Sequence, residues 1–92
     1  MELIREAKAG TLESSDIFVT VEPADELIIR LDSPVKEQFG AAILDAVHDV
    51  LAKSGVRTGK IELADQGALD CTIRARLATA LKRASQAAGD EQ

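Results

Sequence analysis

The sequence predicts a small two-layer α+β domain, in which a mostly antiparallel sheet carries two helices on one face. Short segments alternate apolar with polar residues, and two longer segments repeat apolar residues about every 3.6 positions. These segments follow one another in the order β-β-β-α-β-α. Two helices that bury their apolar sides against one sheet face are the economical arrangement of such a set. With 92 residues the chain has room for a single domain, residues 1–92.

The first three segments are predicted to be strands. Residues 6–12 are expected to pair with residues 16–22 around the tip Glu13-Ser14-Ser15-Asp16, because Ser and Asp favour turns. In segment 16–22 apolar and polar residues alternate, so the side chains on one face of the strand are expected to point inward: Ile17, Val19 and Val21. The segment 26–32 does the same with Leu27, Ile29 and Leu31. The turn Pro23-Ala24-Asp25 between the last two segments predicts that they form an antiparallel hairpin.

A fourth strand and two helices complete the prediction. Residues 57–64 form the strand, with Ile61 and Leu63 on its buried side. Ser33 is expected to cap the first helix, Pro34 to be its first residue and Gly55 to end it. Its apolar stripe comprises Val35, Phe39, Ala42, Ile43, Ala46, Val47, Val50 and Leu51.

The second helix is expected from about Ala68 to Ala87. Its apolar stripe comprises Leu69, Ile73, Leu77, Ala80, Leu81 and Ala84. The last residues, 89–92, are expected to be frayed because nothing in their sequence fixes them to the domain.

Composition argues against several classes of protein. Phe18 and Phe39 are the only aromatic residues, so the sequence lacks stacking platforms for nucleic-acid bases, and the net charge of −5 disfavours a polyphosphate partner. The lone Cys71 cannot form a disulfide within the chain, which fits a reducing compartment. No apolar run approaches the roughly 18 residues of a membrane-spanning helix, and the charged first residues do not resemble a signal peptide. A cytoplasmic protein without membrane or nucleic-acid partners is expected.

Charge is distributed unevenly along the chain. Nine acidic and two basic residues lie between Leu12 and Asp49, whereas basic residues gather near the C-terminus at Arg74, Arg76, Lys82 and Arg83. Two interpretations stay open, an ordinary solvated surface and a bipolar surface that orients the domain on larger partners.

Groups suited to catalysis are few. His48 lies on the polar side of the first predicted helix, and its spacing to Asp45 or Asp49 builds no catalytic triad, so we expect a solvated residue. Cys71 lies beside the buried stripe of the second helix and is expected to be a packed core thiol. One histidine and one cysteine on different elements do not form a metal site, and no glycine-rich phosphate loop occurs. The sequence therefore predicts neither a catalytic residue nor a metal ligand.

Serines remain as candidates for carrying a modification. Ser14 and Ser15 fall at the predicted hairpin tip, where they are also ordinary turn residues. Asp32-Ser33-Pro34 is superficially similar to the Asp-Ser-Leu motif on which ordinary acyl carrier proteins attach phosphopantetheine. Those carriers are all-helical bundles, whereas strand alternation precedes Ser33, and Pro34 stands where their leucine is expected. We therefore reject Ser33 as an attachment site and interpret it as a helix cap.

Several motifs then point to one family. The stretch Ala9-Gly10-Thr11-Leu12-Glu13-Ser14, followed by Asp16, resembles the gamma subunit of citrate lyase, which is its dedicated acyl carrier protein. Three further stretches are similar to that family in the same order: Val35-Lys36-Glu37-Gln38-Phe39-Gly40, Asp49-Val50-Leu51-Ala52, and Gly67-Ala68-Leu69-Asp70-Cys71 with Arg74-Ala75-Arg76-Leu77. The resemblance covers nearly the whole chain.

This resemblance implies a non-catalytic carrier subunit. It implies a 2'-(5''-phosphoribosyl)-3'-dephospho-CoA group, which a dedicated transferase joins through a phosphodiester to the serine that corresponds to Ser14. The thiol of this group would carry acetyl and citryl thioesters. The alpha subunit would exchange acetyl for citrate and release acetate, and the beta subunit would cleave citryl to oxaloacetate. Family sequences commonly have glycine where Ser15 stands, so Ser15 is the alternative attachment residue and the tip is expected to differ in shape.

Two other interpretations stay open. The carrier subunit of malonate decarboxylase uses the same kind of cofactor, although the stretch from Gly67 to Cys71 favours citrate lyase. An interaction or assembly module without a prosthetic group would belong to another functional class. A free-standing enzyme is disfavoured because the base, the nucleophile pair and the metal cluster are missing from the sequence.

Overall fold

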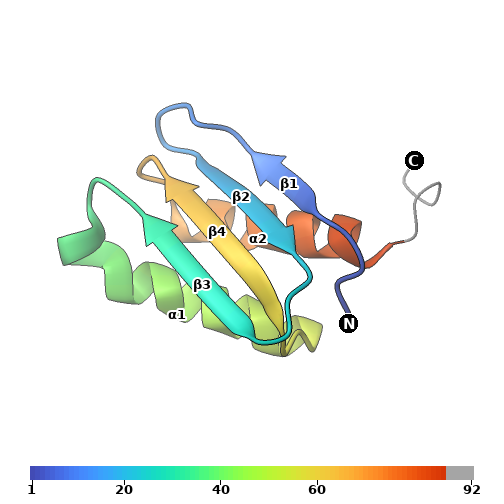
Figure 1. Cartoon of the computed structure of the whole chain (residues 1–92). Helices are drawn as coiled ribbons and strands as arrows, with labels where there is room; N and C mark the ends of the chain where they lie inside the picture. Colours follow the sequence, from blue (N-terminus) through green and yellow to red (C-terminus); the bar gives the residue numbers. More distant parts are fainter. Residues whose placement is uncertain (87–92) are drawn as a thin grey trace.

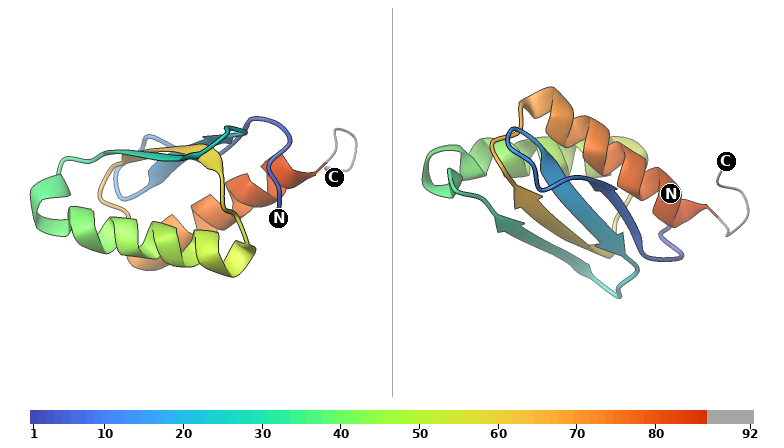
Figure 2. Two further views of the ribbon diagram at one scale, coloured as in Figure 1. Left: turned by 60° about the horizontal axis from the view of Figure 1, so that its bottom comes forward. Right: turned by 90° about the horizontal axis from the view of Figure 1, so that it is seen from above.

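The computed structural model describes residues 1–86. Its elements follow the predicted order: β1 Ala7–Gly10, β2 Ile17–Glu22, β3 Leu27–Asp32, α1 Lys36–Ser54, β4 Gly59–Asp65 and α2 Asp70–Ser85. The sheet forms one layer and both helices cover the same face of it, which confirms the two-layer α+β prediction (Figures 1 and 2). The predicted end of the second helix at Ala87 and the residues expected to fray, 89–92, lie outside the described residues.

The sheet has the strand order β1-β2-β4-β3. Strand β2 pairs antiparallel with β1 and with β4, whereas β3 pairs parallel with β4. The pairing of β1 with β2 was predicted and is confirmed, but the predicted hairpin between β2 and β3 is wrong because β4 lies between them. Residues 23–26 instead cross the beginning of β4, where the amide of Gly59 donates to the carbonyl of Glu26 over 3.1 Å.

The side chains of β4 explain its central place. Ile61 and Leu63 are buried beneath the helices, whereas Ile29 and Leu31 of β3 are only half-buried and Leu27 is exposed. Because β4 is covered by the helices, its backbone N–H and C=O groups need hydrogen-bond partners along both of its edges. β4 therefore occupies the centre and β3 an edge.

The core lies between the helix layer and the sheet. Its buried apolar residues follow the predicted periods of 2 along the strands and 3.6 along the helices. The fully buried members of β2 are Ile17, Val19 and Val21, α1 contributes Ile43, Ala46, Val47, Val50 and Leu51, and α2 contributes Ile73, Leu77, Ala80, Leu81 and Ala84. Within the described residues, no helix is long and apolar enough to cross a membrane.

Both helices begin later than predicted. α1 starts at Lys36 rather than Pro34, after a turn in which the Ser33 hydroxyl accepts a hydrogen bond from the amide of Val35 over 3.2 Å. Ser33 therefore caps this turn and not the helix itself. Gly55 ends α1 as predicted, with a φ of 69° in the left-handed region that glycine adopts easily. α2 starts at Asp70 rather than Ala68.

Five side chains that were assigned to buried positions are exposed: Leu27, Phe39, Ala42, Leu69 and Cys71. Phe39 lies near the start of α1, and this part of the helix projects past the end of the sheet (Figure 2). Leu69 precedes the first residue of α2, and Cys71 lies in the first turn of that helix. His48 is exposed on α1, as predicted.

Gly10 at the end of β1 provides a test of the hairpin geometry. It has a φ of 90°, and a Cβ atom there would lie 1.8 Å from the carbonyl oxygen of Ile17. Gly10→Ala is therefore expected to lower the free energy of unfolding by about 3 kcal/mol in urea denaturation, from strain and overpacking together. Gly67→Ala is the matched control, because Gly67 has a φ of 86° but open space around the same position, and it should cost only about 1 kcal/mol. Equal losses in the two variants would contradict this account.

Candidate functional site

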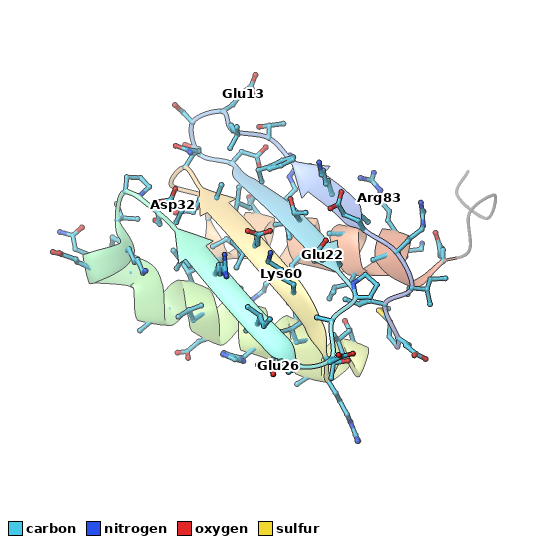
Figure 3. All side chains as sticks on the ribbon, in the orientation of Figure 1. Glu13, Glu22, Glu26, Asp32, Lys60 and Arg83 are labelled. Atoms are coloured by element: carbon cyan, nitrogen blue, oxygen red, sulfur yellow. The ribbon has the colours of Figure 1, made fainter. Side chains whose placement is uncertain are left out.

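Ser14 lies at the tip of the loop that joins β1 to β2 (Figure 1). Its side chain is exposed, and no described residue forms a hydrogen bond with its hydroxyl. The neighbouring Glu13 projects outward from the same loop (Figure 3). The predicted exposed hairpin tip is thus confirmed. An exposed and unbonded hydroxyl is accessible to a second enzyme.

The backbone around Ser14 is held by the neighbouring strand. The amide of Ser15 donates to the carbonyl of Gln66 over 2.8 Å, and the amide of Gln66 donates to the carbonyl of Asp16 over 2.9 Å. The amide of Asp16 also donates to the carbonyl of Glu13 over 3.1 Å, which closes the turn. The tip is therefore fixed by residue 66, immediately after β4, while the Ser14 side chain stays free.

Asp16 fastens the same tip to helix α2. Its carboxylate accepts hydrogen bonds from Nε and Nη2 of Arg76, each over 3.0 Å, so the arginine binds it with two parallel bonds. The Thr11 hydroxyl and the Ile17 amide also donate to it, over 2.7 and 2.8 Å. These bonds, chiefly those from Arg76, lower the pKa of Asp16 from 3.8 to about 2. The carboxylate stays ionised and keeps the two sides of the loop together.

Ser15 has a backbone conformation that is rare for serine. Its φ of 65° lies in the left-handed region, and it is the only non-glycine residue with positive φ in the described part of the chain. That region costs an L-residue about 1–2 kcal/mol, whereas glycine enters it without steric penalty. The conformation at Ser15 accounts for the glycine that the resembled family commonly has at this position.

Ser33 has a structural role. Its hydroxyl donates to the carboxyl of Asp65 over 2.7 Å. Asp65 is only 1 % exposed and is the only buried charged residue among those described, and its second oxygen accepts the amide of Ala68 over 2.9 Å. These two bonds join the turn before α1 to the turn before α2. α2 begins only at Asp70 because the backbone of Leu69 is still extended, with a φ of −70° and a ψ of 157°.

The basic residues near the C-terminus mostly form bonds within the domain. Besides Arg76, Arg74 bridges the helices by donating to Asp49 and, over 2.6 Å, to Asp70. The bonds from Arg74, and secondarily from Lys53, lower the pKa of Asp49. The guanidinium of Arg83 donates to a β1 carbonyl over 2.8 Å. Much of the sequence's positive cluster is thus already engaged rather than free for a partner.

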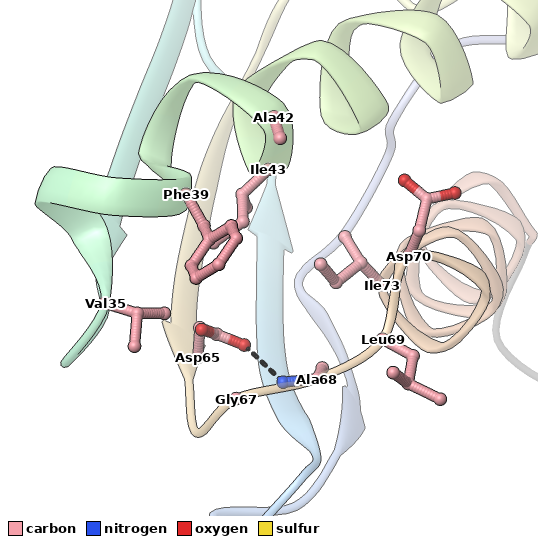
Figure 4. A pocket seen from close by; sticks show the side chains of 10 residues that line it. All are labelled: Val35, Phe39, Ala42, Ile43, Asp65, Gly67, Ala68, Leu69, Asp70 and Ile73. Carbon is pink, nitrogen blue, oxygen red and sulfur yellow. Dashed lines mark hydrogen bonds between the residues drawn. The ribbon is translucent and has the colours of Figure 1, made fainter.

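An apolar pocket of about 460 Å³ opens beside the loop that holds the tip (Figure 4). It lies between the start of α1 and the connection from β4 to α2, and its lining includes Phe39, Ile43, Leu69 and Ile73. Sequence reasoning missed this pocket because the helical period assigned Phe39 and Leu69 to the core. The position of these two residues at the starts of the helices was the one sequence feature that could have indicated their exposure.

Metal and nucleophile chemistry has little support in the described residues. Residues 1–86 contain no group of three or more His, Cys, Asp or Glu side chains that could hold a metal ion. His48 and Cys71 are exposed on different helices, and no hydrogen bond between them is present. The packed core thiol predicted for Cys71 is wrong, because its place in the first turn of α2 faces solvent.

Comparison with known proteins finds similar sequences over most of the chain. The profile of a family described as malonate decarboxylase delta subunit matches residues 4–84. The citrate lyase acyl carrier protein of Albidiferax ferrireducens is 53% identical over 85 residues, which cover 90% of this chain and 87% of that protein. The citrate lyase acyl carrier protein of Streptococcus mutans is 47% identical over 88 residues, covering 94% and 86%.

A solved structure shares the fold. A chain in the crystal structure of a Pseudomonas malonate decarboxylase hetero-tetramer in complex with malonate is similar with a TM-score of 0.75. The match covers 92% of this chain and 93% of that chain at 19% sequence identity. At that identity the likeness establishes the shared fold and nothing about the ligand.

The Asp16–Arg76 pair predicts how stability depends on pH. Because folding lowers the pKa of Asp16 to about 2, the pair stabilises the native state fully above about pH 5, and this contribution is lost as the pH falls towards 2. Arg76→Gln is expected to unfold at lower urea concentration than the wild type at pH 7, and the difference should shrink between about pH 5 and pH 2. Arg83→Gln is the control, because its backbone carbonyl partner does not titrate. A constant difference for Arg76→Gln over this range would refute the assignment.

Proposed function

Because the chain belongs to the family of citrate lyase acyl carrier proteins, we propose that it carries acyl groups on a prosthetic group attached to Ser14. Membership of the family makes the chain a carrier subunit of a lyase, without catalytic machinery of its own, and implies a covalently attached group. The observation that carries the choice of residue is the exposed and unbonded hydroxyl of Ser14 on a tip whose backbone is fixed.

The proposed group is 2'-(5''-phosphoribosyl)-3'-dephospho-CoA, joined through a phosphodiester to Oγ of Ser14. The residues present fit such a group, since Ser14 Oγ faces solvent and the residues around it are exposed. When bound, the group supplies a thiol that holds acetyl or citryl as a thioester. Ser33 fits poorly, because its hydroxyl is half-buried and bonded to Asp65.

The chain's own residues position the attachment oxygen. Arg76 holds one side of the tip through Asp16, and Gln66 holds the residue that follows Ser14. Ser14 is therefore presented at a constant place on the domain, away from the core. A tether from this point raises the local concentration of the acyl group at each partner in turn.

The proposed partners are three proteins. The alpha subunit of citrate lyase would exchange acetyl for citrate, and the beta subunit would cleave the citryl group to oxaloacetate. A dedicated transferase would install the prosthetic group. The names of the similar proteins support a multi-subunit citrate lyase, and the chain of similar fold comes from a hetero-tetramer.

A second candidate is the carrier subunit of malonate decarboxylase. The matching family profile supports it. The identities favour citrate lyase, because citrate lyase acyl carrier proteins are 45% to 53% identical to this chain, against 19% for the malonate decarboxylase chain. Co-purification of the chain with citrate lyase or malonate decarboxylase subunits from its native host would separate the two.

Substitution of the serines tests the attachment site. Ser14→Ala is expected to fold normally and to gain no mass when it is produced together with the transferase, because the accepting oxygen is missing. Ser15→Ala and Ser33→Ala are the controls and are expected to gain the full adduct by intact mass spectrometry. Ser33→Ala should also unfold about 1–3 kcal/mol more easily, because it removes a bond to the buried Asp65.

Fragmentation of the loaded wild-type protein completes the test. An adduct on Ser15 would move the site by one residue within the same tip. Loading that survives in Ser14→Ala but disappears in folded Ser33→Ala would overturn the assignment. Bare wild-type protein in a host that makes the transferase would favour an assembly module without a prosthetic group.

A further inference from the structure

The pocket beside the tip has the character of a binding site for a neutral, largely apolar chain. Its volume of about 460 Å³ lies within the roughly 300–1,000 Å³ of small-molecule sites. Its lining is apolar apart from Asp65 and Asp70, of which Asp70 already accepts a hydrogen bond from Arg74, and it includes no Lys, Arg or His. Phe39 and Leu69 at its rim are 55 % and 69 % exposed, and large apolar side chains grouped in this way mark a surface that binds something.

The pocket adjoins the attachment point. Ser15, next to Ser14, donates its amide to the carbonyl of Gln66, and the following residue, Gly67, lines the pocket. The space where a Cβ atom of Gly67 would lie is empty, with no heavy atom within 4 Å. The open space at Gly67 is therefore available to a chain that starts at Ser14 and enters the pocket.

One of the two acidic side chains in the pocket, Asp65, suits an amide donor. The carboxyl of Asp65 faces the pocket beneath Phe39 (Figure 4). One of its oxygens accepts the Ser33 hydroxyl and the other accepts the Ala68 amide. A carboxylate oxygen has a second lone pair, so Asp65, although only 1 % exposed, keeps acceptor capacity for a group that enters the pocket it lines. Apolar walls with an unused acceptor match a chain of methylene groups and amides.

We propose that this pocket holds the thiol-bearing arm of the group attached to Ser14. The inference rests on the proposed function. Phe39, Ile43 and Ile73 contact the alkyl parts of the arm, and Asp65 accepts an amide N–H from it. The docked arm is shielded from water between visits to partner subunits, and it leaves the pocket when a partner offers a better site.

An apolar side chain from a partner is the competing occupant. The tether favours the arm, because a short flexible link gives an effective concentration on the order of millimolar. The arm is also present whether or not a partner is bound. The experiment below distinguishes the two occupants.

Thiol reactivity of the loaded protein tests the proposal. The protein carries Cys71→Ser, since Cys71 is exposed and would react as well, and its adduct on Ser14 is verified by mass. The rate with a neutral reagent, 4,4'-dithiodipyridine, is compared with that of free coenzyme A. A thiol docked about nine-tenths of the time reacts about 10-fold more slowly than the free one. Leu69→Ser is expected to remove most of this protection.

Ile4→Ser is the matched control, because Ile4 is 54 % exposed and lies near the end of α2, away from the tip. It should leave the rate unchanged. In parallel, the amide chemical shifts of residues 67–73 should differ between the loaded and the bare protein. This difference between loaded and bare forms should disappear in Leu69→Ser.

The outcomes separate the two levels of the proposal. Loaded protein whose thiol reacts as fast as free coenzyme A overturns the docking of the arm and leaves the proposed function intact. Unchanged protection in Leu69→Ser, with weaker binding to the alpha or beta subunit, assigns the pocket to a partner and also overturns it. Protein that acquires no adduct on Ser14 overturns the proposed function together with the inference.

Discussion

The way strand β4 ends determines the arrangement of the end of the domain that carries Ser14. Asp65 accepts bonds from Ser33 in the turn before α1 and from Ala68 in the turn before α2. Gln66 bonds the hairpin tip through its amide and its carbonyl. Three connections that are distant in sequence thus meet at two consecutive residues. A buried carboxyl is tolerated here because each of its oxygens is bonded, and removing either partner would leave a costly unpaired group.

The tip shows how a small domain can combine a fixed backbone with a free side chain. The bonds to Gln66 involve only main-chain atoms, and the bonds to Arg76 involve the side chain of Asp16. Neither set uses the Ser14 hydroxyl. Order in the tip therefore does not compete with modification of the serine. The cost is the strained φ of Ser15, which a chain with glycine at that position would avoid.

Periodicity in the sequence was sufficient to assign the faces of the elements but not their neighbours. The alternation of apolar and polar residues predicts which face of a strand is buried, but it does not predict which strand lies beside it. The position of β4 between β2 and β3 therefore could not be predicted from the local sequence. The helical period likewise predicts which side of a helix faces the core, but Phe39 and Leu69, at the starts of the two helices, are exposed although they lie on that side. The proposal of Ser14 as the attachment residue came from turn chemistry and family resemblance. The bond of Arg76 to Asp16 spans 60 positions and no pattern of spacing encodes it.

The start of the chain lies at the pole opposite Ser14 (Figure 1). The amino group of Met1 donates to the carbonyl of Gly55 over 3.4 Å, and the amide of Ile4 donates to the carbonyl of Ala84 over 2.8 Å, where the two helices end. A linker, label or solid support joined to the amino terminus therefore acts on the far side of the domain. The domain can be immobilised or fused in line with another protein while its serine faces outward, which makes it usable as an oriented module in built assemblies.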